Sequence, residues 1–195
     1  MEEDKTMTFT CQEMSSIIFQ SLYEQKKSSR FCDITLYVNG KVIRAHRNVL
    51  ACASPYFNSI LKYHKVVREQ LTVNCPDVDI FDSIINYMYT GQISIEHATV
   101  GEMLKLADCF IMTKVIEHCI EFLGTKLSLH NCLFTYNLTL SFKLKQLRNL
   151  VENWIMTHMN EVCDGDEVAN LSIADVQEFL KSKVSRNLQR SVLYR

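Results

Sequence analysis

Apolar residues near the start of the chain recur at helical spacing. Met14, Ile17, Ile18, Phe19 and Leu22 follow helical spacing, with polar residues on either side of the 17–19 run. This spacing places them on one broad face of a helix. The sequence therefore predicts a first helix whose apolar face needs a partner.

A different period follows the first helix. Apolar and polar residues alternate over 34–38, which is the two-residue period of a half-buried strand. Asn39-Gly40 comes next and tolerates the positive φ angles of a type I′ turn, whose twist suits two antiparallel strands. With the following run 41–45, the pattern predicts a β-hairpin.

The remaining apolar positions predict mostly helices. Pro55 disfavours helix at Ser54 and suits a first helical turn, so helices are expected at 46–53 and 55–61. Asp77 and Asp79 offer N-caps to a helix that ends at Gly91. Further helices are predicted at 100–110, 115–127, 129–141, 144–159 and 172–182, and short strands at 71–74 and 92–95.

Composition supports a helix-dominated globular protein. The 195 residues include only five Gly and two Pro, whereas 47% are apolar, so turn residues are scarce and core material is ample. The length suits one domain with a small appendage. The formal charge of −1 does not favour nucleic acid as a direct partner. It combines −6 on residues 1–180 with five positive charges on 181–195.

The eight cysteines do not form a recognisable site. No two of them lie closer than ten residues, which excludes CxxC redox pairs and local zinc knuckles. His118-Cys119 and His130 with Cys132 supply no set of four converging ligands, so we expect neither a metal nor a cofactor. The chain shows neither a secretion signal nor a run of ~20 apolar residues. Buried, reduced cysteines in a soluble cytoplasmic protein, or one that also enters the nucleus, are expected.

Several sequence strings occur in a fixed order: Phe31-Cys-Asp-Ile-Thr-Leu36, Ala45-His-Arg-Asn-Val-Leu50, Ala51-Cys-Ala-Ser-Pro-Tyr-Phe57, Tyr87-Met-Tyr-Thr-Gly91 and Leu104-Lys-Leu-Ala-Asp108. Together they resemble the BTB/POZ domain in the form used by kelch-like proteins. Leu129-His-Asn-Cys-Leu133 through Trp154-Ile-Met-Thr-His158 resembles the 3-box at the start of the BACK domain that follows it.

The resemblance implies an α+β, mostly helical fold: a BTB/POZ domain with a small three-stranded core sheet, followed by an all-α partial BACK segment. The expected divisions are an N-terminal tail at 1–13, the BTB/POZ domain at 14–124, the 3-box and start of BACK at 125–180, and a basic tail at 181–195. The match weakens after residue 180, and no kelch repeat is found. A fragment, a splice form and a naturally short relative all remain open.

The resemblance also implies a homodimer, and a short hairpin sheet cannot by itself cover so many apolar helix faces. A catalytic acid and base at Asp33 and His46 is not expected, because no nucleophile, phosphate loop or metal set accompanies them. These residues are instead expected to be structural, or to line a corepressor pocket as in zinc-finger relatives. The expected dimer interface is formed by Ile17, Ile18, Leu22, Asp33, His46, Arg47 and Leu50.

Kelch-like relatives contact the N-terminal domain of cullin-3 through a hydrophobic-x-Glu motif, which Val67-x-Glu69 matches with a smaller first residue than the usual Met. Phe110 is expected either at the same surface or in the core. In the 3-box-like segment, core packing is the alternative for each residue. The expected cullin-binding residues are Val67, Glu69, Phe110, Leu129, Cys132 and Leu133.

These expectations define a non-enzymatic adaptor that binds cullin-3 in a ubiquitin ligase complex. One alternative is a transcriptional regulator that recruits corepressors, although no zinc-finger array is found. Another is a truncated dimerisation partner of full-length kelch-like proteins. No membrane partner is expected in any of them.

Overall fold

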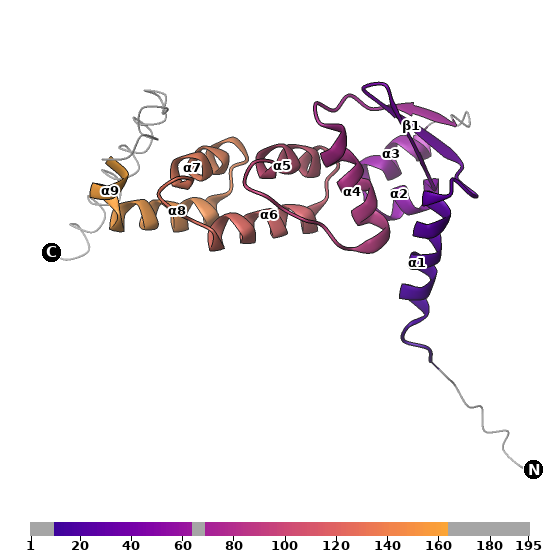
Figure 1. The fold of residues 1–195 in the computed structure, drawn as a ribbon, viewed down its shortest axis with the longest axis horizontal. Helices are drawn as coiled ribbons and strands as arrows, with labels where there is room; N and C mark the ends of the chain where they lie inside the picture. The colour runs from indigo at the N-terminus through magenta and orange to yellow at the C-terminus, as the bar shows by residue number, and fades with distance from the viewer. Residues whose placement is uncertain (1–9, 64–68, 164–195) are drawn as a thin grey trace, which may run out of the picture. The chain divides into compact units, whose positions relative to one another are not determined.

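The computed structural model describes residues 10–63 and 69–163. Contacts divide the chain into two units, 1–119 and 120–195, which are considered separately (Figure 1). The predicted helix at 172–182 and residue Val67 lie outside the described residues.

Unit 1 combines a small sheet with helices. Its strands are β1 (Ile34–Val38), β2 (Lys41–Ala45) and β3 (Gln70–Thr72). Its helices are α1 (Met14–Lys27), α2 (Arg47–Ala53), α3 (Pro55–Tyr63), α4 (Val78–Thr90) and α5 (Val100–Cys109), and α6 (Thr113–Thr125) runs across the boundary between the units.

The predicted hairpin forms the centre of a three-stranded sheet with the order β2-β1-β3. Strand β1 pairs antiparallel with β2, and Val38 lies opposite Lys41 across the turn. Asn39 and Gly40 have φ angles of 47° and 84°, which fit the expected type I′ turn. Strand β3 pairs with β1 in parallel, and the inward side chains of β1 are buried in the core of this unit.

The break between α2 and α3 lies at Ser54, as the following proline predicts. The Ser54 side chain is fully buried. Its hydroxyl donates to the Phe110 carbonyl oxygen at 2.7 Å and accepts from the Phe57 N–H at 3.3 Å. It therefore caps the start of α3 and ties that start to the end of α5, which lies more than fifty residues later.

Helix α4 begins and ends where its caps predict. Asp77 accepts hydrogen bonds from the backbone N–H groups of Asp79 and Ile80 at 2.9 and 3.0 Å. Gly91 ends the helix in the left-handed conformation, with φ of 66°. Asp79 is not a cap; its carboxylate pairs with the Lys41 ammonium at 3.2 Å.

Helix α1 lies against α4 and contributes no fully buried residue. Towards its C-terminal end, the Lys26 ammonium donates to Asn86 Oδ1 at 2.7 Å and lies 3.6 Å from Asp82 Oδ1. The Tyr23 and Tyr89 rings are 6.3 Å apart. Figure 1 shows the N-terminal part of α1 extending away from the sheet.

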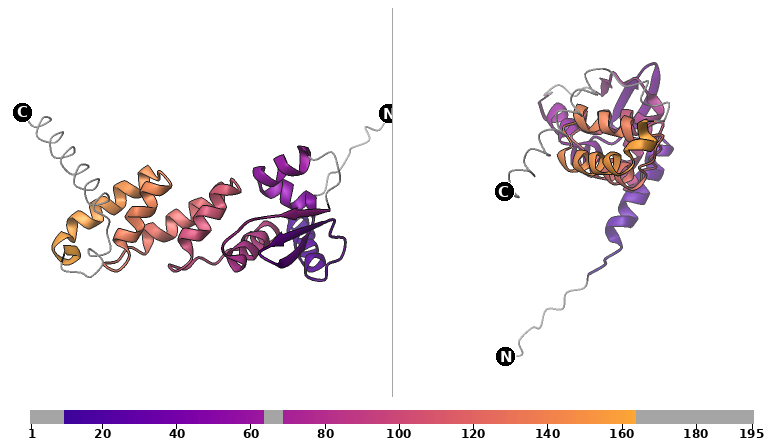
Figure 2. Two further views of the ribbon diagram at one scale, coloured as in Figure 1. Left: turned by 90° about the horizontal axis from the view of Figure 1, so that it is seen from above. Right: turned by 90° about the vertical axis from the view of Figure 1, so that its left-hand side faces the viewer.

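Unit 2 contains α7 (Cys132–Ser141), α8 (Lys145–Thr157) and α9 (Met159–Cys163). Helices α7 and α8 lie side by side (Figure 2). Between them, the buried Glu152 carboxylate accepts from Arg148 Nε at 2.8 Å, and Arg148 also reaches the Tyr136 hydroxyl at 3.3 Å. This polar network gives the charge of Glu152 a partner inside an otherwise apolar packing layer.

Several sequence predictions of secondary structure need correction. Residues 92–95 form no strand; Ile93 and Ile95 are half-buried and their neighbours exposed, but no ladder of backbone hydrogen bonds forms along them. The other predicted short strand lies at 70–72 rather than 71–74. Residues 129–131 form a turn before α7, and the helix predicted at 144–159 ends at Thr157, where His158 separates it from α9.

Candidate protein-interaction surface

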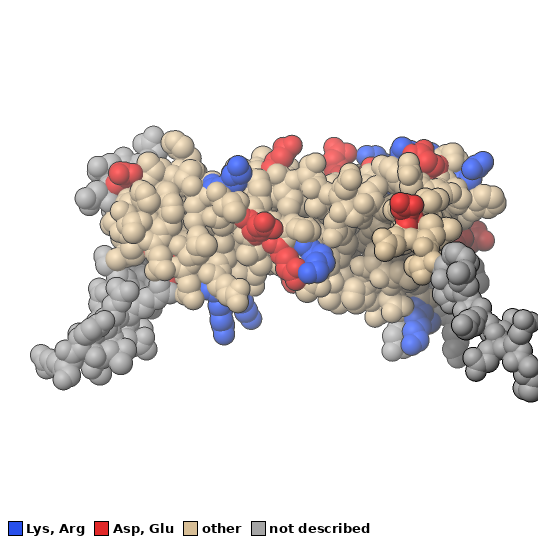
Figure 3. Space-filling model, turned by 90° about the horizontal axis from the view of Figure 1, so that it is seen from below, with Lys and Arg blue, Asp and Glu red and all other residues tan. Residues whose placement is uncertain are grey.

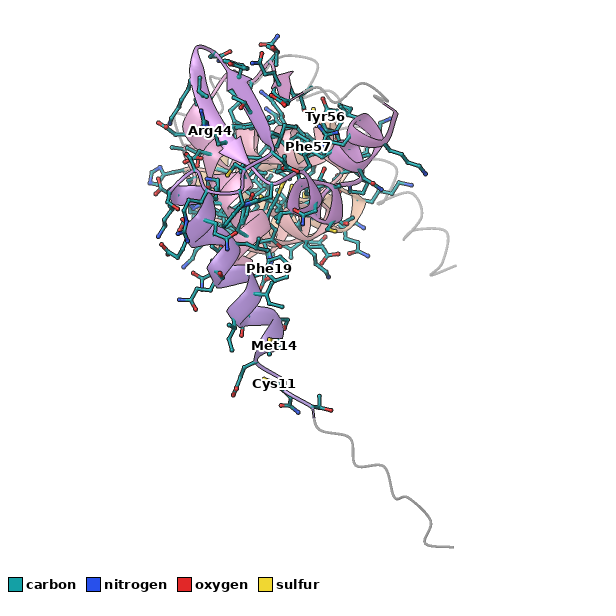
Figure 4. The ribbon with its side chains drawn as sticks, turned by 90° about the vertical axis from the view of Figure 1, so that its right-hand side faces the viewer. Cys11, Met14, Phe19, Arg44, Tyr56 and Phe57 are labelled. Carbon is teal, nitrogen blue, oxygen red and sulfur yellow. The ribbon has the colours of Figure 1, made fainter. Side chains whose placement is uncertain are left out.

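An uncovered apolar face lies on the N-terminal half of α1. Met14, Ile17 and Ile18 are 50%, 55% and 50% exposed, and their spacing places them on one side of the helix. This set is called the α1 stripe below. In Figure 4, Met14 and Phe19 lie on the part of α1 that extends from the body of the unit. Three half-exposed side chains of this size present roughly 300 Å² of apolar surface to water.

A groove lies beside the same helix. It has a volume of about 570 Å³, and its lining comes from α1, the α2–α3 junction, the end of α4 and the turn before α6. Met88 and Met112 in this lining are buried, whereas Phe19 and Ile111 are exposed. The lining residues that matter below are Ser15, Phe19, Met88, Ile111 and Met112. This set is called the α1 groove.

Lys114 is the one charged side chain among the described residues that line the groove. On the face of the molecule in Figure 3, Lys and Arg are interspersed with Asp and Glu among uncharged residues. None of the helices in the described residues is both long enough and apolar enough to cross a membrane. The exposed apolar residues are therefore the physical signal that identifies this surface.

The predicted interface residues differ in accessibility. Ile17 and Ile18 belong to the exposed α1 stripe, and Leu22 is half-buried. Leu50 is fully buried within its own chain. Its placement in a dimer interface therefore needs correction, because the packing around α2 leaves none of its side chain for a second protomer.

Asp33 and Arg47 meet at the start of α2. Asp33 is exposed, and its Oδ1 accepts from the Arg47 backbone N–H at 2.8 Å. The carboxylate thus satisfies one of the four N–H groups left open at a helix start. This contact matches the structural interpretation of Asp33.

His46 is buried behind this helix start. Its backbone N–H donates to the Tyr89 hydroxyl at 2.8 Å, and its Nδ1 lies 3.0 Å from the same oxygen. Its Nε2 lies 3.3 Å from the Arg30 carbonyl oxygen. Burial raises the pKa of Tyr89 to about 12, so the phenol keeps its proton at neutral pH. His46 is thus held by α4 and by the loop that follows α1.

Glu69 is the described member of the predicted hydrophobic-x-Glu motif. Its side chain is exposed, while its carbonyl oxygen accepts from the Thr35 N–H at 2.7 Å, directly before β3. The sheet therefore fixes the backbone from which this carboxylate projects. Val67 lies outside the described residues.

Phe110 lies in the core, which was one of its two predicted locations. It is 2% exposed, and its ring centroid lies 5.3, 5.1 and 5.8 Å from those of Tyr56, Phe57 and Phe81. Its expected contact with cullin-3 is therefore not available to the side chain. The next residue, Ile111, carries the exposed apolar surface at this turn.

The three predicted residues of the 3-box-like segment differ in solvent exposure. Leu129 is exposed in the turn before α7, whereas Cys132 and Leu133 are buried in unit 2. The core alternative therefore describes Cys132 and Leu133. Leu129 is the one of the three whose side chain reaches solvent.

The cysteines are less uniformly buried than expected. Cys11, Cys52 and Cys109 are exposed, Cys32 is half-buried, and Cys75, Cys119 and Cys132 are buried. Burial raises the pKa of Cys119 to about 12, so this thiol does not form a reactive thiolate at neutral pH. In residues 10–63 and 69–163, no three His, Cys, Asp or Glu side chains are grouped to hold a metal ion.

The fold and this surface define a protein-interaction domain: a small sheet supports helices, one of which presents apolar residues to solvent. The chain belongs to the BTB/POZ family, since residues 22–127 match the BTB/POZ domain. It is 33% identical to human kelch-like protein 11 over 183 residues, which cover 88% of this chain and 26% of that protein. The chain thus spans about a quarter of the length of this kelch-like relative.

Solved structures support the same assignment. The BTB domain of zebrafish PATZ1 superposes with a TM-score of 0.58 at 28% identity, covering 62% of this chain and all of that one. The BTB domain of human gigaxonin gives a TM-score of 0.54 at 25% identity, covering 60% of this chain and 98% of that one. The predicted BTB/POZ fold is confirmed.

Sequence reasoning missed several structural features of unit 1. Phe31 and Ile111 both adopt positive φ angles, which no local motif announces for a phenylalanine or an isoleucine. Lys26 fixes α1 on α4 through partners sixty residues away. The Ser-Pro step could have identified Ser54 as a cap, but not its bond to Phe110.

Proposed function

We propose that this protein is a dimeric adaptor that binds the N-terminal domain of cullin-3 in a ubiquitin ligase complex and performs no catalysis itself. The coarser statement, a BTB-type protein-interaction module related to kelch-like proteins, rests on the family match. Cullin-3 binding, dimerisation and a cytoplasmic location are parts of the proposal. We also propose that residues 125–180 are the 3-box and the start of a BACK domain.

The observation that carries cullin binding is the placement of Glu69. An exposed carboxylate projects from backbone that is hydrogen-bonded into the central sheet. A charged group on a fixed backbone loses little conformational freedom when a partner donates hydrogen bonds to it. This is what a recognition residue requires, and it lies in the motif that resembles the cullin-binding motif of kelch-like proteins.

Dimerisation is supported by the α1 stripe. The largest exposed apolar patch of a soluble protein, commonly a few hundred Å², is often a functional site, and a second copy would remove the stripe from water. Two protomers would then present two cullin-binding surfaces, so that a multivalent partner gains avidity. A non-catalytic role agrees with Asp33 and His46, which hold the start of α2 and the Tyr89 hydroxyl.

Isothermal titration calorimetry with the purified cullin-3 N-terminal domain tests the proposal. Wild-type protein should release or absorb heat with 1:1 stoichiometry per chain, and Glu69→Ala and Val67→Ala should weaken binding. Glu96→Ala is the matched control, because Glu96 is an exposed glutamate of the same unit outside the motif. Absence of heat from folded wild-type protein at concentrations on the order of tens of micromolar would contradict cullin binding.

The dimer is tested separately by light scattering over a range of concentrations. A mass of two chains is expected, and Ile18→Asp should shift the protein towards the mass of one chain. Wild-type protein that stays monomeric throughout would refute the dimer and leave the cullin test unaffected.

A further inference from the structure

The α1 stripe alone is too small for the proposed dimer. At roughly 300 Å² per copy, two stripes would bury about 600 Å² in total, whereas a stable interface buries about 1,200 Å² or more. Unit 1 must therefore contribute further apolar surface from each copy. Phe19 and Ile111, which line the α1 groove, and Phe31, which follows the C-terminal end of α1, are exposed apolar residues that can supply it.

Phe31 and Ile111 share a second property. Phe31 is 77% exposed and Ile111 is 55% exposed, and their φ angles are 57° and 56°. The left-handed conformation is unfavourable for residues other than Gly, Asn and Asp. Each position therefore combines backbone strain with exposed apolar surface, and glycine or asparagine would avoid both costs. Residues that keep such a combination are candidates for a binding role.

The two positions lie at opposite ends of α1. Phe31 follows the C-terminal end of the helix, which is Lys27. Ile111 borders the α1 groove, whose α1 side chains come from its N-terminal half. In an antiparallel pair of α1 helices, the C-terminal end of each helix lies beside the N-terminal end of the other. A two-fold axis makes such contacts reciprocal, since the same two patches meet twice.

We infer that Phe31 of each protomer inserts into the α1 groove of a second copy of this chain, against Phe19 and Ile111. This inference rests on the proposed dimer and identifies its central contact. The groove offers about 570 Å³, and a cavity of about 150 Å³ is enough for a benzene ring. With Phe31, Phe19 and Ile111 included, the buried area reaches roughly 1,300 Å² in total, within the range of a stable dimer.

Complementary charges provide the test. Phe31→Asp removes the inserted phenyl ring from both contacts of the dimer, and Ile111→Lys changes both grooves. The dissociation constant of each variant dimer, measured by sedimentation analysis, should therefore rise at least about tenfold. In an equimolar mixture, a heterodimer has one wild-type contact and one Asp–Lys contact. The mixture should therefore form more dimer than either variant alone.

Val42→Asp is the matched control, because Val42 is an exposed apolar residue of β2 that belongs to neither the α1 stripe nor the α1 groove. The dissociation constant of this variant dimer should equal that of the wild type. Circular dichroism identifies any variant that does not fold, and the reversed pair Phe31→Lys with Ile111→Asp then replaces it.

The outcomes separate this inference from the proposed function. If the wild type is a dimer and Phe31→Asp leaves its dissociation constant unchanged, the contact between Phe31 and the partner's α1 groove is overturned, whereas the proposed dimer is not. Two monomeric variants whose mixture also stays monomeric overturn it as well, because Phe31 and Ile111 then do not meet. A monomeric wild type refutes the dimer and this contact together.

Discussion

Replacing Ser54 with alanine tests how the start of α3 is joined to the end of α5. The substitution removes the O–H that donates to the Phe110 carbonyl at 2.7 Å and the oxygen that accepts from the Phe57 N–H at 3.3 Å. A buried acceptor without its donor costs about 1–3 kcal/mol, and a lost N-cap costs about 1 kcal/mol. Ser54→Ala should therefore lower the free energy of unfolding by roughly 2–4 kcal/mol, out of the roughly 5–15 kcal/mol that is common for domains.

Urea unfolding followed by circular dichroism measures this loss, and in a separate thermal scan the melting temperature should fall by about 4–16 °C. Ser59→Ala is the matched control, since Ser59 lies exposed in the same helix. There the higher helix propensity of alanine should stabilise the protein by up to about 0.5 kcal/mol. If the two variants lose the same stability, the bond between Ser54 and Phe110 does not contribute as described.

Three further outcomes follow from buried groups. Phe110→Ala should cost about 3–5 kcal/mol in urea unfolding, as for other fully buried aromatic residues; a loss below 1 kcal/mol would contradict its core position. Arg148→Leu leaves the buried Glu152 without its guanidinium partner and should cost about 3 kcal/mol, whereas a change equal to that of an exposed ion pair would argue against this network. Above pH 9, stability should fall as pH rises, by at most about 1.4 kcal/mol per pH unit for each group. The reason is that burial raises the pKa values of Cys119 and Tyr89 to about 12 in the folded state, whereas their ordinary values are 9.0 and 10.0. An unfolding free energy that stays constant from pH 9 to 11 would refute this expectation.

Local sequence patterns predicted correctly those helices and strands whose ends are marked by turn or capping residues. The hairpin follows from alternation and Asn39-Gly40, and α4 from a capping aspartate and a C-terminal glycine. The strand predicted at 92–95 had the alternation but lacked a partner. A strand is completed only by pairing with another strand, and a single sequence does not contain that information.

The predicted site residues divide according to the same distinction. The sequence does not distinguish exposed from buried apolar residues at these positions. Ile17 and Ile18 are exposed, whereas Leu50 and Phe110 are buried. Of the two locations expected for Phe110, the surface and the core, the structure places its side chain in the core. Residues separated by fifty or more positions, such as Ser54 and Phe110, meet only through the fold.

The exposure of Phe31 and Ile111 cannot be predicted from residue type alone. A phenylalanine after a helix and an isoleucine after another helix are ordinary in sequence, and both would be assigned to a core by hydrophobicity alone. In the structure both residues have positive φ angles and exposed side chains. A glycine or asparagine would adopt these backbone angles at lower cost, and a contact with a second protomer would offset the cost at both positions.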